Sequence, residues 1–188
     1  MKINVGCGES CNDGYVPIDK IYGQEIMEID FPVGSVDEIY CSHMLEHLDK
    51  CDAEILMSRF HKWLKVNGTL FLAVPDLEAI AELILIGEEK TRLFGMLFGT
   101  PYREYRHKWG WTRSTLIELA NESGFSYVKD FEPFMKSNEE MLKVFYTNGF
   151  DTSAAIYIDR GEHIYKLSLN MEFSNDKDSR TFDKCKIV

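Results

Sequence analysis

The sequence predicts a single α/β domain: a mostly parallel sheet with helices on both faces and an antiparallel strand near the C-terminus. Three observations support this prediction. Short apolar runs close to the N-terminus end at glycine or polar residues. An amphipathic helical pattern is followed by a β-branched and aromatic run, which is half of a βαβ unit. A late run alternates apolar and polar residues, as antiparallel strands with one solvated face do.

Composition and charge narrow the class of protein. The chain has 188 residues, 45% hydrophobic and 13% aromatic, which suits one globular domain and excludes long disorder. Five cysteines at irregular spacing favour a reducing cytoplasm over a disulfide framework. A net charge of -10 opposes nucleic-acid binding, and no signal peptide or membrane-spanning run is evident. We expect a cytoplasmic protein without nucleic-acid or membrane partners, and a homo-oligomer is left open.

The first four apolar runs are interpreted as strands, and each is followed at its C-terminal end by glycine or a polar residue. These runs are Lys2–Val5 and residues 15–19, 26–29 and 36–41, and they end at Gly6, Asp19, Asp30 and Ser42. Only nine residues separate Val5 from Tyr15, so an irregular loop is expected there in place of a crossover helix. Ligands of such sheets bind beyond the strand C-termini, which is where the site is expected.

The later elements follow from periodicity. Residues 49–64 repeat apolar side chains every three or four positions, which predicts a helix capped by Asp49 or Asp52 and stopped at residues 66–68. Strands are predicted at residues 69–74, 127–134 and 165–173, and helices at residues 77–86 and 114–123. No linker divides the chain, so residues 1–174 are assigned to one domain and residues 175–188 to a polar, frayed tail.

The glycine turn and the carboxylates are candidates for binding a nucleoside. Gly6-Cys7-Gly8 alone fits a tight turn equally well. Asp19, at the end of the next strand, can accept hydrogen bonds from both hydroxyls of a ribose. Asp30 can accept one from an exocyclic amine, and Phe31 beside it can cover a purine. Considered alone, an aspartate at such a position is more often a solvent-exposed capping residue than a ligand-binding one.

Four motifs in this order resemble the class I S-adenosylmethionine-dependent methyltransferases, in particular compact members that begin at the glycine strand. The motifs are residues 4–8, residues 14–19, residues 35–40 with 44–48, and residues 63–70. The resemblance covers residues 2–76 and implies a Rossmann-like fold with S-adenosylmethionine as cofactor and S-adenosylhomocysteine as product. The cofactor-binding residues it suggests are Gly6, Cys7, Gly8, Asp19, Asp30, Phe31, Ser42 and His43.

The reaction implied by the resemblance is methyl transfer to an oxygen or nitrogen of a small-molecule acceptor. A hydroxyl acceptor needs a base, for which His43 is the first candidate and His107 the second, although either histidine can equally be structural. Residues 88–111 interleave aromatic and basic side chains and are predicted to form a lid, with a core helix and loop as the alternative. The acceptor-binding candidates are Tyr102, Tyr105, Arg106, His107 and Trp109.

Two other functions stay open. His43-x-x-Glu46-His47 fits the H-x-x-E-H signature of zinc metallohydrolases, but it follows a strand directly and lacks a third ligand, so we expect no metal. A module that binds S-adenosylmethionine without transferring its methyl group is equally compatible with the cofactor motifs.

Overall fold

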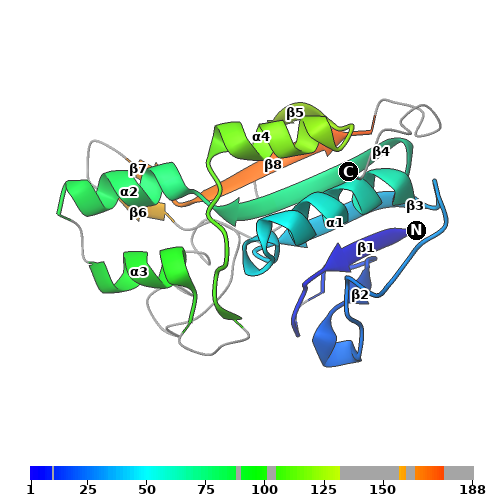
Figure 1. Ribbon diagram of the computed structural model, residues 1–188, viewed down its shortest axis with the longest axis horizontal. Helices are drawn as coiled ribbons and strands as arrows, with labels where there is room; N and C mark the ends of the chain where they lie inside the picture. Colours follow the sequence, from blue (N-terminus) through cyan, green and yellow to red (C-terminus); the bar gives the residue numbers. More distant parts are fainter. Residues whose placement is uncertain (10, 88–89, 101–104, 132–156, 160–163, 176–188) are drawn as a thin grey trace.

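The computed structural model describes residues 1–9, 11–87, 90–100, 105–131, 157–159 and 164–175 (Figure 1). A six-stranded sheet with the order β2-β1-β3-β4-β8-β5 forms its centre. The strands are β1 (Lys2–Val5), β2 (Val16–Ile18), β3 (Val36–Ser42), β4 (Leu64–Pro75), β5 (Ser126–Asp130) and β8 (Ser168–Ser174). Strands β1 to β4 are parallel, and β8 runs antiparallel to β4 and β5. The predicted mostly parallel sheet with an antiparallel C-terminal strand is confirmed.

Helices α1 (Lys50–Trp63) and α4 (Arg113–Glu122) pack together on one face of the sheet (Figure 1). The core beneath them includes Leu56, Phe60, Leu116 and Leu119. Helices α2 (Leu77–Leu85) and α3 (Lys90–Phe98) lie beyond the C-terminal end of β4 and share a smaller cluster. The helices of the described chain thus lie on one face of the sheet or beyond its end. No described helix is long and apolar enough to span a membrane.

The opposite face of the sheet carries aromatic rings. This cluster joins Tyr15, Tyr40, Phe71 and Phe131, whose rings meet edge to face. A small hairpin of β6 (Tyr157–Asp159) and β7 (Ile164–Lys166) forms a separate sheet. The predicted strand at residues 165–173 is therefore divided between β7 and β8, and residues 132–134 of another predicted strand lie outside the described residues.

The connections around β2 differ from helical crossovers. From β1 to β2 the described chain forms turns, as the short spacing predicted, and Gly6 donates its N–H to the Ile18 carbonyl at 2.8 Å. After β2 comes a short 3₁₀ helix, η1 (Lys20–Tyr22). The strand predicted at residues 26–29 is wrong. That run packs Ile26 and Met27 against the core, and Arg59 donates to both of their carbonyls, so a partly buried loop, not a strand, explains its apolar character.

Helix α1 ends at Trp63, three residues before the predicted stop, and β4 begins at once. Asn67, with φ of 62°, lies inside β4. The side chain of Asn175 donates to the carbonyls of His61 and Leu64, both at 3.1 Å, and so satisfies groups that the helix end leaves open. Asn175 was predicted to begin the frayed tail but is buried, and residues 176–188 lie outside the described residues.

Strand β8 is mostly buried on both faces. Ser168 and Asn170, on the side predicted to be solvated, are buried like Leu169 and Met171, whereas Glu172 and Ser174 on that side are partly exposed. The Ser168 hydroxyl donates to the Asn170 side-chain oxygen at 2.8 Å, which compensates part of their burial. The alternation of apolar and polar residues therefore predicted the strand correctly, but the solvated face that it also predicted is mostly buried.

Candidate active site

The glycine loop after β1 is tied to the end of β2. Gly8 donates its backbone N–H to Oδ2 of Asp19 at 2.9 Å, and Ile21 donates to Oδ1 at 3.1 Å. Gly6 and Gly8 have φ of 68° and 56°. A Cβ at Gly6 would lie 2.5 Å from Cγ of Met44, whereas one at Gly8 would meet nothing within 4 Å. The loop is thus packed closely at Gly6 and borders open space at Gly8.

The thiol of Cys7 is not a reactive thiolate. Burial, together with the neighbouring Cys11 and Asp19, raises its pKa to about 11. Its Sγ lies 3.5 Å from the Gly8 carbonyl, where a protonated thiol is a weak donor. Cys7 therefore takes part in the loop as a small, neutral side chain.

His43, the residue after β3, has both ring nitrogens engaged. Its Nδ1 lies 3.2 Å from Oε1 of Glu46, and its Nε2 lies 3.2 Å from the Ser168 hydroxyl. Its backbone N–H donates to the Ala73 carbonyl, and its φ of 50° is unusual for a residue other than glycine. These contacts favour a positioning role for His43 over that of the base. Ser42, the last residue of β3, pairs with Ala73 and lies at the same edge.

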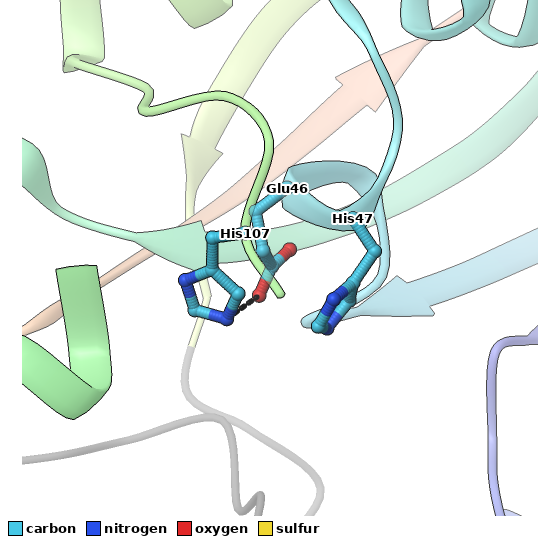
Figure 2. A group of neighbouring side chains, drawn as sticks. All are labelled: Glu46, His47 and His107. Carbon is cyan, nitrogen blue, oxygen red and sulfur yellow. Dashed lines mark ion pairs between the residues drawn. The ribbon is translucent and has the colours of Figure 1, made fainter. Parts of the chain in front are cut away.

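Glu46 lies at the centre of a histidine cluster. It belongs to the 3₁₀ helix η2 (Leu45–His47) and is only 1% exposed. Nε2 of His107 lies 4.0 Å from its Oε1, and the rings of His47 and His107 meet edge to face with centroids 4.9 Å apart (Figure 2). Glu46 also belongs to the motif at residues 44–48, but only the zinc motif gave it a chemical role, and no sequence pattern places His107 beside it.

Burial and charge decide the protonation of this cluster. Burial alone would raise the pKa of Glu46, but hydrogen bonding with His43 and the three surrounding histidines outweigh it and hold the pKa below its usual value. Burial lowers the pKa of His107, an effect that Glu46 opposes only in part. At neutral pH, Glu46 is therefore a carboxylate and His107 a neutral imidazole.

The segment that carries His107 is hydrogen-bonded to η2. Lys108 and Trp109 both donate backbone N–H groups to the Glu46 carbonyl, at 2.8 and 3.3 Å. His107 donates its N–H to the Phe98 carbonyl at the end of α3. Of the predicted acceptor residues, Tyr105, Arg106 and Trp109 are exposed, His107 is partly buried, and Tyr102 lies outside the described residues. Arg106, His107 and Trp109 thus contact η2, which follows β3, whereas the Tyr105 carbonyl accepts from Thr100 after α3.

Asp30 and Phe31 lie at the opposite edge of the sheet, so the prediction that they share the site is wrong. Oδ1 of Asp30 accepts a hydrogen bond from Nε1 of Trp63 at 2.7 Å, and the Phe31 ring packs edge-on against that indole. Trp63 is the last residue of α1, where the chain enters β4. Both residues therefore stabilise the packing of α1 at the N-terminal ends of the strands.

The arrangement of the zinc motif also differs from the H-x-x-E-H pattern. His43 precedes η2, which has only three residues, and its Nδ1 faces Glu46. His43 and His47 are therefore not presented from successive turns of one helix, as that motif requires. The grouping that the structure assembles is Glu46, His47 and His107.

The chain is similar to known methyltransferases. A family model described as a methyltransferase domain matches residues 8–130. A crystal structure of Burkholderia thailandensis 1,6-didemethyltoxoflavin-N1-methyltransferase, with bound 1,6-didemethyltoxoflavin and S-adenosylhomocysteine, has the same fold at 12% identity and a TM-score of 0.52, covering 92% of this chain and 69% of that one. An S-adenosylmethionine-dependent methyltransferase from Mesorhizobium loti is 13% identical with a TM-score of 0.49, covering 88% and 71%. No curated protein matches the chain.

Proposed function

The chain belongs to the methyltransferase-domain family and is an S-adenosylmethionine-dependent methyltransferase, and from this premise we propose that its acceptor is a small molecule with a nucleophilic oxygen or nitrogen. One observation supports the proposal above all. The glycine loop with Asp19 and the Glu46 cluster follow neighbouring parallel strands, so they share the C-terminal edge of the sheet. This is the edge at which such sheets bind ligands.

The residues around Asp19 fit the nucleoside part of the cofactor. Each oxygen of the Asp19 carboxylate accepts one backbone N–H and has a further lone pair with which to accept from a ribose hydroxyl. Gly8 leaves open space where a side chain would stand. When bound, S-adenosylmethionine supplies a methyl group on a positive sulfur, which the acceptor atom displaces in line as S-adenosylhomocysteine leaves.

The segment from Tyr105 to Trp111 is the proposed acceptor side of the site. Tyr105 and Trp109 are 56% and 42% exposed, which is unusual for large rings and suits contact with a planar acceptor. The hydrogen bonds from Lys108 and Trp109 to Glu46 fix this segment to the end of β3. Holding an acceptor in line with an activated methyl group supplies as much as roughly 7–11 kcal/mol of rate enhancement, so positioning is the main task of these residues.

Two measurements on the purified protein test the proposal. Titration calorimetry with S-adenosylhomocysteine tests the cofactor, with a nicotinamide dinucleotide as the negative control; we expect binding of the first alone. S-adenosylmethionine labelled in the methyl group is then incubated with fractionated small metabolites, and we expect label in at least one fraction. Binding without transfer in every fraction would identify a binding module, and label in protein or nucleic acid would contradict a small-molecule acceptor.

A further inference from the structure

The geometry points to a binding site for a divalent transition-metal ion formed by Glu46, His47 and His107. Each residue offers one ligand atom, and the three atoms lie within 4.8 Å of one another. The sequence predicted no metal because the H-x-x-E-H motif lacked a third ligand, and the fold supplies that ligand as His107. Two imidazole nitrogens and one carboxylate oxygen are a donor set suited to zinc, cobalt or iron.

The burial of Glu46 is the first reason for this assignment. The carboxylate is 1% exposed, and among the residues that the structure describes neither of its oxygens has a hydrogen-bond partner of good geometry. A buried carboxylate is costly unless a cation or several donors accompany it. Nδ1 of His43 lies 3.2 Å from Oε1 and is the rival partner. A metal ion between Glu46 and His107 would supply the cation.

The orientation of the two imidazoles is the second reason. Nδ1 of His47 lies 3.2 Å from the Arg106 carbonyl, which can only accept, so this nitrogen carries the proton and Nε2 keeps a free lone pair. The His107 ring is hydrogen-bonded to the Met96 backbone, while its Nε2 faces Glu46 (Figure 2). A hydrogen bond from one ring nitrogen to a carbonyl is the usual way in which proteins orient a histidine that binds a metal through the other.

The separation of the ligand atoms is the third reason. His107 Nε2 and Glu46 Oε1 are 4.0 Å apart, which is too long for a direct hydrogen bond. Two ligands bound tetrahedrally to one metal at about 2.0–2.2 Å stand roughly 3.3–3.6 Å from each other. The two atoms would therefore need to approach by only about 0.4–0.7 Å to share one ion.

The protein backbone holds the two halves of the site together. Glu46 and His47 come from η2, and His107 comes from the segment after α3, where Lys108 and Trp109 donate to the Glu46 carbonyl. With three protein ligands, a bound ion keeps at least one position for water or a ligand, as catalytic metal sites do. The metal site stands on these contacts alone and does not depend on which acceptor the enzyme methylates.

Cobalt(II) is the probe for the test, because its visible absorption reports coordination and thiolate ligands add a charge-transfer band. The chain has free cysteines at positions 7 and 11 that could capture a metal by themselves. The full-length protein, cleared of metal with a chelator, is titrated with cobalt(II) and then with zinc(II) as competitor. We expect one equivalent of cobalt bound without a thiolate band and displaced by zinc.

Variants locate the ion. His107→Ala and Glu46→Gln should each weaken cobalt binding by more than the 10–100-fold typical of losing an outer partner of a ligand, and His43→Ala, which removes such a partner, by about that range. Cys7→Ser with Cys11→Ser is the matched control and should bind cobalt unchanged. Circular dichroism verifies that each variant is folded, and His47→Gln replaces any that is not.

Each possible outcome of these experiments either supports or overturns the proposed metal site. One equivalent of cobalt, lost in folded His107→Ala or His47→Gln and kept in the cysteine variant, supports the site. A thiolate band that disappears with the cysteines would overturn it, because the ion would then lie at the glycine loop. Absence of stoichiometric binding to the folded wild type would equally overturn it and leave His43 as the partner of Glu46.

Discussion

Gly8 donates its backbone N–H to the Asp19 carboxylate at 2.9 Å, which adds a side-chain hydrogen bond to the backbone bond that joins the glycine loop to the end of β2. The same carboxylate is the N-cap of η1. Asp19 thus orders both the loop before it and the turn after it, and its side chain is already oriented before any ligand arrives. Preorganisation of this kind lowers the entropic cost of binding.

The first prediction concerns Asp19. Asp19→Ala should weaken S-adenosylhomocysteine binding by tenfold or more, because a charge-assisted hydrogen bond contributes about 1.5–3 kcal/mol and the loop also loses its anchor. Titration calorimetry measures the change. Asp30→Asn, at the opposite edge of the sheet, is the matched control and should bind normally. Unchanged affinity in a folded Asp19→Ala protein would remove Asp19 from the site.

The second prediction compares two glycines with positive φ. Gly6→Ala should destabilise the protein by about 2–5 kcal/mol, because about 1–2 kcal/mol of backbone strain adds to about 1–3 kcal/mol of overpacking against Met44. Gly14→Ala should show the backbone strain alone, since φ is 82° and a Cβ there meets nothing within 4 Å. Urea unfolding of both variants gives the comparison. Equal losses would show that Met44 yields to the new methyl group.

The third prediction concerns stability in acid. Hydrogen bonding with Lys65 and with the amine of Met1 lowers the pKa of Asp37 from 3.8 to about 2. The stabilisation from this pair is therefore fully present above pH 3.8 and lost as the pH falls through about 2. Asp37→Asn should lower the urea midpoint at pH 5, and the difference from wild type should shrink towards zero near pH 2. Because the pair is exposed, molar salt should reduce the difference at pH 5; a difference independent of salt and pH would contradict this origin.

The fourth prediction concerns the buried amide of Asn175. Asn175→Ala should destabilise the protein by about 2–3 kcal/mol, since it removes the hydrogen bonds that the buried amide donates to the carbonyls of His61, Leu64 and Lys65. Asn121→Ala, on the exposed side of α4, should change stability by less than about 0.5 kcal/mol. Chemical unfolding compares the two. Similar losses would mean that water replaces the Asn175 amide.

Local pattern was enough to predict most of the fold. Strands β1 to β4 follow from short apolar runs, and helix α1 follows from apolar residues repeated every three or four positions. The loop between β1 and β2 follows from the short spacing of these strands. All of these patterns involve residues that are close together in the sequence. The run at residues 26–29 was misinterpreted because an apolar segment can be buried either by pairing in a sheet or by packing along a helix. Arg59, whose hydrogen bonds to this run settle the choice, lies far along the chain.

The candidate site could be assembled from the sequence only where its residues directly follow a short strand. Gly6 and Asp19 are proposed on that ground, since they come directly after β1 and β2. The approach of His107 to Glu46 depends on hydrogen bonds from the backbone N–H groups of Lys108 and Trp109 to the Glu46 carbonyl. Almost any residue can make such backbone hydrogen bonds, so the amino-acid sequence does not reveal them. Similarly, nothing near Asp30 indicates that Trp63 is its partner.

The position of β8 between β4 and β5 governs how the chain is completed during synthesis. Residues emerge from the ribosome in order, so β4 and β5 are both made before the strand that joins them. Until residue 174 is free, the twelve-residue β4 has an unpaired edge rich in apolar side chains, the kind of edge that pairs with other chains. Nascent chains stalled within the last strand should therefore be the species most prone to aggregate and most dependent on chaperones.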